Sequence, residues 1–254
     1  MNMKNLAVIV LSCLIVSCNN GKQTKQNEDV IKEVDMKKEN NSPLKSQLEE
    51  RKTNFALKAN DNKKRAYKEG IESVEESGIV KAAKQVGDIA PEFILNNALG
   101  KPVKLSDYLK KGKVVLTWYR GNWCPYCNLT LTALQAELSN FKAQGANLIA
   151  LTPELPDESI STSEKHNLDF EVLSDVGNKV AKKYGIVFQL TDEVAEMYNL
   201  SFELNKHNGD DTNELPLAVT YIINEKGEII YAFLDADYRN RAEPSEITDF
   251  LKNN

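Results

Sequence analysis

The chain predicts an α/β fold in which helices flank a mixed central sheet. Strand and helix signals alternate after residue 85, a β-hairpin pattern follows, and the chain ends in a helical pattern. The predicted strands are Val114–Trp118, Asn147–Leu151, Phe170–Leu173, Val219–Asn224 and Glu228–Leu234. The predicted helices are Leu129–Phe141, Asn178–Tyr184 and Pro244–Leu251.

Each element depends on a local pattern. The run at 114–118 is short and rich in β-branched residues, which is typical of a buried strand. Gly185 can end the helix at 178–184 in a left-handed conformation. The turn at 225–227 joins the last two strands. Apolar residues at helical spacing predict the helix after the first strand: Cys127, Leu131, Leu134, Leu138 and Phe141.

The first 17 residues have the pattern of an export signal. Lys4 precedes an apolar run at 6–16, which has the length of a secretory h-region and is too short to span a bilayer. Residues 14–18, Leu-Ile-Val-Ser-Cys, resemble the lipobox of bacterial lipoproteins. We therefore expect a cleaved signal at 1–17 and a lipid on Cys18 that anchors the chain to a membrane of the bacterial cell envelope, on its periplasmic or surface face. The alternative is an ordinary secretory signal with an incidental cysteine.

Two further segments precede the predicted α/β domain, which spans residues 86–254. Residues 18–42 hold too few apolar side chains to offset their ordering entropy, which predicts a flexible tether. Residues 43–85 predict a helical extension packed on the main domain, with helices from Pro43 to about Asn60 and from Lys63 to Ser77. The alternative for this part is a partly ordered, highly charged stalk.

The composition argues for a globular protein and against two kinds of partner. Of the 254 residues, 41% are hydrophobic and 27% are charged, as in an ordinary globular chain. The net charge of -5 argues against nucleic acid, because phosphate binding needs clustered Lys and Arg. No apolar run reaches the roughly 20 residues of a spanning helix. The predicted membrane contact is therefore the lipid anchor.

We expect only two of the four cysteines to be free thiols in the mature protein. Cys13 lies in the predicted signal and Cys18 would be thioether-linked, so Cys124 and Cys127 remain as the thiols of the mature chain. Export places them where disulfides can persist. An internal disulfide, if one forms, joins these two residues.

Cys124 and Cys127 directly follow a predicted strand and open a predicted helix. The thiolate is the reactive form of cysteine, and the N–H groups and partial positive charge of a helix N-terminus lower a thiol pKa. We expect this effect to be greatest at Cys124, which makes it the better nucleophile. Cys127 lies one turn further inward and would be the more buried, resolving thiol. Pro125 fits the first helical turn, where its missing N–H does no harm.

Other readings of the cysteine pair are weaker. A structural zinc site needs four ligands, whereas the chain offers one pair and two distant histidines, His166 and His207, which we expect to be solvated. Haem attachment needs a histidine at position 128, which is Asn. An inert disulfide is possible, but its loop is too small to constrain the unfolded chain much. We predict no metal and no cofactor.

The residues around the pair resemble the peroxiredoxin-like branch of the alkyl hydroperoxide reductase/thiol-specific antioxidant family. The most specific part is residues 118–128, Trp-Tyr-Arg-Gly-Asn-Trp-Cys-Pro-Tyr-Cys-Asn, and the resemblance covers about residues 50–254. Supporting segments are Val86–Phe93, Leu173–Asp175, Val180–Gly185 and Asp237–Pro244.

The resemblance implies a thioredoxin-like fold and thiol-dependent reduction of hydroperoxides. Cys124 would attack the peroxide and become a sulfenic acid, and Cys127 would condense with it to a disulfide. A thioredoxin-like partner would reduce that disulfide by exchange.

Some positions depart from the family's pattern. Ordinary peroxiredoxins carry Thr or Ser at the position of Gly121, and Pro at the position of Thr117. Ala218 stands where they carry an Arg and where thioredoxins carry a cis-Pro, with Pro216 two residues upstream. The same features fit a protein-disulfide oxidoreductase of the cell envelope. A non-enzymatic binding lipoprotein is the third hypothesis.

Three further residues are candidates for the site. Arg120 would stabilise the thiolate or polarise a peroxide oxygen, or else form a salt bridge at the end of its strand. Arg241 would reach the site from the C-terminal segment, or else anchor the last helix. Trp123 would shield the disulfide and contact a partner, or else pack in the core.

Overall fold

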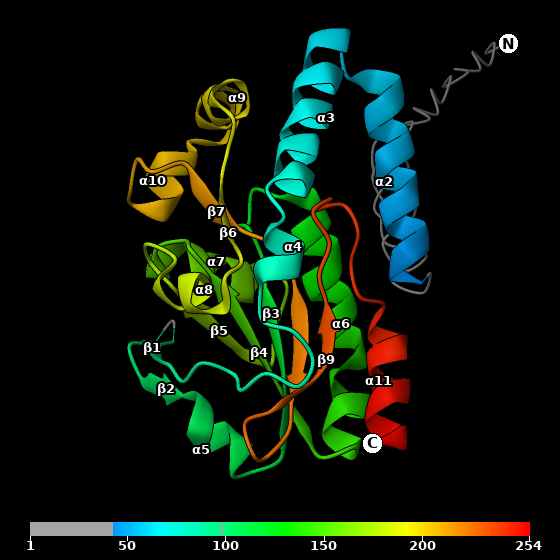
Figure 1. Ribbon diagram of the computed structural model, residues 1–254, viewed down its shortest axis with the longest axis vertical. Helices are drawn as coiled ribbons and strands as arrows, with labels where there is room; N and C mark the ends of the chain where they lie inside the picture. Colours follow the sequence, from blue (N-terminus) through cyan, green and yellow to red (C-terminus); the bar gives the residue numbers. More distant parts are fainter. Residues whose placement is uncertain (1–42, 98) are drawn as a thin grey trace, which may run out of the picture. The chain divides into compact units, whose positions relative to one another are not determined.

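The computed structural model describes residues 43–97 and 99–254 (Figure 1). The predicted signal peptide, Cys18 and the predicted tether lie outside the described residues. A five-stranded sheet in the order β5-β4-β3-β8-β9 forms the centre. Its strands are β3 Lys113–Trp118, β4 Ala146–Thr152, β5 Glu171–Ser174, β8 Thr220–Ile223 and β9 Ile229–Phe233. Strands β3, β4 and β5 run parallel to one another, whereas β8 runs antiparallel to both of its neighbours, β3 and β9, so the predicted mixed sheet is confirmed.

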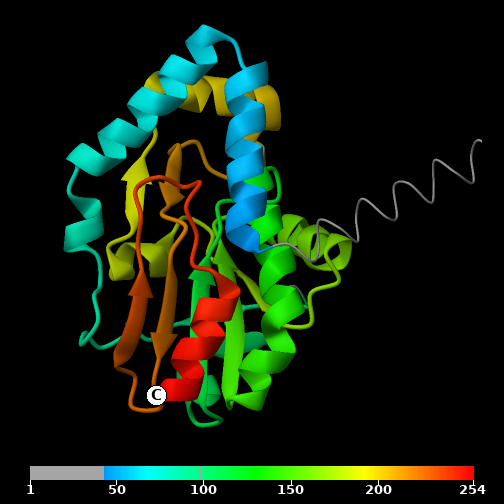
Figure 2. The same cartoon turned by 90° about the vertical axis from the view of Figure 1, so that its right-hand side faces the viewer.

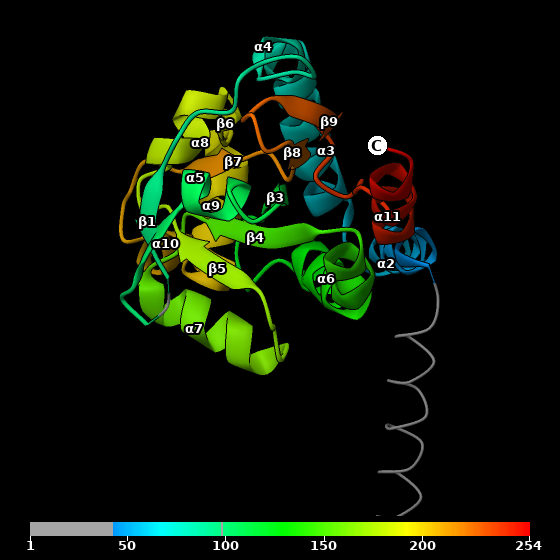
Figure 3. The ribbon, with the colours of Figure 1, turned by 90° about the horizontal axis from the view of Figure 1, so that it is seen from below.

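Helices cover both faces of this sheet. Helices α6 (Pro125–Ala143) and α11 (Pro244–Asn253) lie side by side on one face (Figure 3). Val115 points to that face, whereas Val114, Leu116 and Trp118 point to the other, because side chains alternate along a strand. Three short helices lie over the second face: α4 Ile79–Ala82, α5 Leu105–Leu109 and α8 Lys179–Tyr184.

Both helices predicted for the extension are present, as α2 (Leu44–Lys58) and α3 (Asp61–Glu76). Leu44 and Leu48 are buried against α6, and α2 runs beside it (Figure 2). The carboxylate of Glu243 accepts hydrogen bonds from the backbone N–H groups of Leu44 (3.1 Å) and Lys45 (2.8 Å). It thus caps α2 from a residue far along the chain. The extension packs on the α/β domain and is not a free stalk.

Several elements are absent from the sequence prediction. They are β1 Ile94–Asn96, β2 Pro102–Lys104, α7 Pro156–Lys165, β6 Val187–Gln189, α9 Asp192–Phe202, α10 Leu204–Asn208 and β7 Glu214–Pro216, together with α4 and α5. Helix α7 has little apolar periodicity because the side chains it buries are those of Ser159 and Thr162. Within the described part of the chain, no helix has both the length and the hydropathy to cross a bilayer.

Candidate redox site

Cys124 and Cys127 lie where the sequence places them, at the start of the helix after β3. Cys124 is the N-cap of α6, and Pro125 is its first residue. The backbone N–H of Cys127 donates to the carbonyl oxygen of Cys124 at 3.0 Å, which closes the first turn. Both are free thiols, and both are buried, with 1% and 0% of their surfaces exposed. The expected difference in their burial is therefore absent.

Two arginines approach the pair from distant parts of the chain. The backbone N–H of Arg120, just after β3, donates to the Cys127 sulfur at 3.4 Å. The Nη2 group of Arg241, between β9 and α11, donates to the same sulfur at 3.5 Å. The Nη1 group of Arg241 is held by the carbonyl oxygen of Asn240 at 2.8 Å. Both candidate arginines therefore lie at the site.

The charges around the pair favour a thiolate at Cys127. Burial raises the pKa of the Cys124 thiol, and its neighbour Cys127 raises it further. Burial opposes ionisation of Cys127 too, but the Cys124 thiol and the positive charges of Arg241 and Arg120 together lower the pKa of Cys127 to about 5. The sequence expected the lowered pKa at Cys124, and this was wrong. The Arg120 backbone N–H and the Arg241 side chain both donate to the Cys127 sulfur, which favours the ionised form of Cys127.

The Arg120 side chain is buried, with 1% of its surface exposed, inside a cage of aromatic rings. Its guanidinium carbon lies 5.1, 5.2 and 4.0 Å from the ring centres of Trp123, Tyr198 and Tyr238. Nη2 donates to the Tyr198 hydroxyl at 2.7 Å, whereas Nε and Nη1 have no hydrogen-bond partner in the described structure. The expected alternative, a salt bridge with a carboxylate, is absent from the described residues. Burial of such a cation is costly without a negative neighbour, and Arg120 lines the same pocket as Cys124.

A small pocket of about 100 Å³ opens onto Cys124. Its walls include Cys124, Arg120 and Trp123 from the α/β domain, and Phe55 and Tyr67 from the helical extension. A water molecule occupies about 30 Å³, so the pocket admits a ligand of a few non-hydrogen atoms. A larger hollow of about 360 Å³ lies beside β5 and contains neither cysteine.

Trp123 both packs and lines this pocket. Its ring stacks on Phe202, with 5.4 Å between ring centres, and lies 5.2 Å from Tyr198. A Cβ atom at Gly121 would lie 2.2 Å from the Trp123 Nε1 atom. The departure from the family's Thr or Ser at this position therefore makes room for the tryptophan ring. The described residues contain no cis peptide bond, and Pro216 lies in β7.

The structure adds residues that the sequence did not single out. Tyr198 and Tyr238 belong to the aromatic cage around Arg120. The apolar residues at helical spacing in α9 could have indicated that Tyr198 is buried. His207 was expected to be solvated, but only 19% of its side chain is exposed, beside Glu154 and Glu158. His166 is half-buried as well, and its Nδ1 atom lies 3.2 Å from the Thr132 hydroxyl. These expectations were wrong because His207 lies in α10 and His166 ends α7, and neither helix was predicted.

Two cysteines in the first turn of the helix after a central strand, in a five-stranded mixed sheet, define a thioredoxin-like thiol protein. The chain belongs to the AhpC/TSA family, which it matches over residues 86–232. The solved structure of peroxidoxin BcpB from Mycobacterium tuberculosis has the same fold, with a TM-score of 0.53 and 18% identity, over 66% of this chain and 97% of that one.

Three curated relatives are similar over parts of the chain. The putative peroxiredoxin bcp of Buchnera aphidicola subsp. Schizaphis graminum is 37% identical over 39% of this chain and 63% of its own. Chloroplastic peroxiredoxin Q of Triticum aestivum is 29% identical over 67% of this chain and 66% of its own. Thiol-disulfide oxidoreductase ResA of Bacillus cereus is 30% identical over 41% of this chain and 59% of its own. The chain thus spans less than two thirds of the length of these relatives.

Proposed function

We propose that this protein is a thiol peroxidase that reduces hydroperoxides through a Cys124/Cys127 dithiol-disulfide cycle. The observation that carries the proposal is the buried Arg120 guanidinium, whose Nε and Nη1 donors have no partner within the described structure. Arg120 lines a pocket that also contains Cys124. Donors of this kind stabilise the negative charge that develops on a leaving oxygen. The relatives named as peroxiredoxins support the same activity.

The cycle begins with a proton shift within the pair. Cys127 holds the negative charge at rest, and Cys124 transfers its proton to Cys127 as it attacks. The Cys124 sulfur bonds to one peroxide oxygen while the O–O bond breaks, which gives a sulfenic acid and an alkoxide. The alkoxide takes the proton from the Cys127 thiol and leaves as the alcohol, which restores the Cys127 thiolate. The Cys127 thiolate then displaces hydroxide from the sulfenic acid, which leaves as water after protonation and completes the disulfide.

We propose that a thioredoxin-type dithiol closes the cycle. Its thiolate attacks the Cys124–Cys127 disulfide and forms a mixed disulfide, and its second thiol releases the reduced pair. We also propose that the chain acts at the cell envelope, held by a lipid on Cys18. Replacement of Cys18 by Ala would release the protein from membranes, and unchanged membrane fractionation would contradict the anchor.

Hydroperoxide consumption coupled to thioredoxin, its reductase and NADPH tests the peroxidase proposal. Wild-type protein should consume hydroperoxide and form a Cys124–Cys127 bond that mass spectrometry detects after a single addition of oxidant. Cys124→Ser should abolish consumption, and Arg120→Met should reduce it about 100-fold or more, as expected for loss of an oxyanion donor. Consumption no faster than in Cys124→Ser would refute the proposal.

A second candidate is a protein-disulfide oxidoreductase. The two-residue spacing of the cysteines and the similarity to ResA favour it. Reduction of insulin disulfides by the wild-type protein, without hydroperoxide consumption, would select this function. Failure of both assays, with no Cys124–Cys127 bond after mild oxidation, would leave the non-enzymatic binding lipoprotein.

A further inference from the structure

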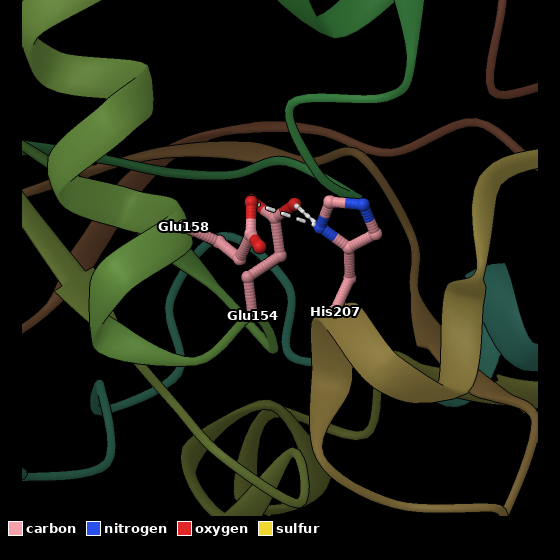
Figure 4. A group of neighbouring side chains, drawn as sticks. All are labelled: Glu154, Glu158 and His207. Carbon is pink, nitrogen blue, oxygen red and sulfur yellow. Dashed lines mark ion pairs between the residues drawn. The ribbon is translucent and has the colours of Figure 1, made fainter.

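Glu154, Glu158 and His207 form a cluster beside the redox loop (Figure 4). Glu154 follows β4, Glu158 lies in the first turn of α7, and His207 lies in α10. The backbone N–H of Leu155 donates to the His207 carbonyl oxygen at 2.8 Å, which ties α10 to the start of α7. The three side chains therefore meet because the fold holds their backbones together.

The spacing of the three side chains is that of ligands around one ion. The His207 Nδ1 atom lies 3.0 Å from Glu158 Oε2 and 3.6 Å from Glu154 Oε1. One ligand atom from each residue lies within 4.8 Å of the others. Zinc-ligand bonds of about 2.1 Å place two tetrahedral ligands about 3.4 Å apart. The observed distances bracket this value.

Hydrogen bonds account for only part of the cluster. Glu154 accepts from the Asn122 backbone N–H at 2.9 Å and from the Thr152 hydroxyl at 3.4 Å, and Glu158 accepts from the Asn122 side-chain amide. The His207 Nδ1 atom is buried and has no hydrogen-bond partner in the described structure, although two carboxylate oxygens lie close to it. The Glu154 side chain is fully buried. Within the described part of the chain, no Lys or Arg pairs with Glu154 or Glu158. A buried carboxylate of this kind calls for a cation.

We propose that Glu154, Glu158 and His207 bind a divalent first-row transition-metal ion such as Zn²⁺. Imidazole with carboxylates is a donor set for this class, whereas Ca²⁺ and Mg²⁺ take oxygen ligands. The Glu158 side chain is 32% exposed and that of His207 is 19% exposed, so solvent reaches one side of the site. The ion would complete its coordination there with water.

The proposed site is linked to the redox loop through Asn122. The Asn122 backbone N–H donates to Glu154 Oε1 at 2.9 Å, and its side-chain amide donates to Glu158 Oε2 at 3.0 Å. Asn122 lies two residues before Cys124, and the Asn128 side chain binds the Asn122 carbonyl oxygen at 2.8 Å. An ion bound to the two carboxylates would therefore fix the loop that carries Cys124. The site itself is independent of which redox reaction the cysteines perform.

Cobalt titration of the full chain with all four cysteines replaced by serine tests the site, because this background removes every thiolate ligand. We expect one Co²⁺ per chain, weak visible d–d bands, no sulfur-to-cobalt charge-transfer band, and displacement by Zn²⁺. Glu158→Gln and His207→Ala should each weaken Co²⁺ binding at least about tenfold, because loss of a ligand costs no less than loss of its supporting contacts.

Two matched variants serve as controls. Glu164→Gln changes an exposed acid elsewhere on α7, and His166→Ala removes the other histidine of the chain; both should bind Co²⁺ as the serine background does. Absence of d–d bands, or equal affinities in the ligand variants and the controls, would overturn the proposal. So would an imidazolium–carboxylate pair, seen by NMR as a His207 ring that stays protonated and excludes Co²⁺ at neutral pH. Circular dichroism of each variant confirms that it is folded.

Discussion

Replacement of Arg241 by Met should raise the pKa of Cys127 and make the site sensitive to acid. The Arg241 Nη2 group lies 3.5 Å from the Cys127 sulfur, and its charge helps to lower the pKa of Cys127 to about 5. At an effective dielectric constant of about 20, two unit charges about 4 Å apart interact by about 4 kcal/mol. Arg241 is partly exposed, so solvent screens much of this energy. About 2 kcal/mol remains, which is about 1.5 pKa units.

The consequence depends on pH in a defined direction. A thiol is ionised above its pKa, so a pKa raised from about 5 to about 6.5 removes thiolate in the acid range. At pH 5.5 the ionised fraction of Cys127 should fall from about three quarters to about one tenth. At pH 7.5 both proteins should be about nine-tenths ionised or more. Arg241→Met should therefore lose about eightfold in thiolate at pH 5.5 and almost nothing at pH 7.5.

The ultraviolet absorbance of the thiolate, titrated in the reduced protein and corrected with Cys127→Ser, measures this fraction. Arg239→Met is the control, because Arg239 belongs to the same segment but its Nε and Nη2 groups bind Asp237 at 2.8 Å. An Arg241→Met titration that overlays the wild-type curve would refute the reasoning. An equal shift in Arg239→Met would show that the effect is not specific to the charge beside the sulfur.

Three further predictions concern the packing around the site, each measured by chemical denaturation. Gly121→Ala should lower the free energy of unfolding by about 1–3 kcal/mol, because its Cβ would overlap the Trp123 ring; an unchanged midpoint would show that the ring has room to move. Tyr198→Phe should lower it by about 1–3 kcal/mol by leaving the Arg120 Nη2 group without its acceptor; stability equal to the wild type would mean that another acceptor replaces the hydroxyl. Glu243→Ala should cost about 1 kcal/mol by uncapping α2 and should speed amide exchange in that helix; unaltered exchange would contradict its role as a cap.

The elements that carry the cysteines were predictable because they combine two strong local signals. The β-branched run of β3 and the apolar spacing of α6 fix a strand followed by a helix, and this places Cys124 and Cys127 in the first helical turn. The mixed sheet followed from the same alternation and the hairpin pattern after it. The helices of the extension were also predicted, although α3 begins two residues before the predicted Lys63, with Asn60 as its N-cap.

The electrostatics of the site could not be predicted from local sequence patterns. Arg241 lies 114 residues from Cys127 in sequence, and its hydrogen bond depends on how the segment after β9 folds back. The lowered pKa therefore falls on a thiol that helix position alone does not favour. The surroundings of His207 were hidden for a similar reason: α7 presents hydroxyl groups to the interior, so its sequence carries no apolar stripe.

Both cysteines are almost completely buried. In a catalytic cycle, a small oxidant and a protein reductant would therefore reach them by different routes. The pocket of about 100 Å³ that Cys124 lines has room for an oxidant of a few atoms. A protein thiol is attached to a folded surface, and it reaches a sulfur that is 1% exposed only when the chain around the pocket opens. Oxidation would then proceed at the rate of encounter, and reduction at the rate of opening. The oxidised protein would be the species that accumulates during turnover, and its lifetime would report how often that opening occurs.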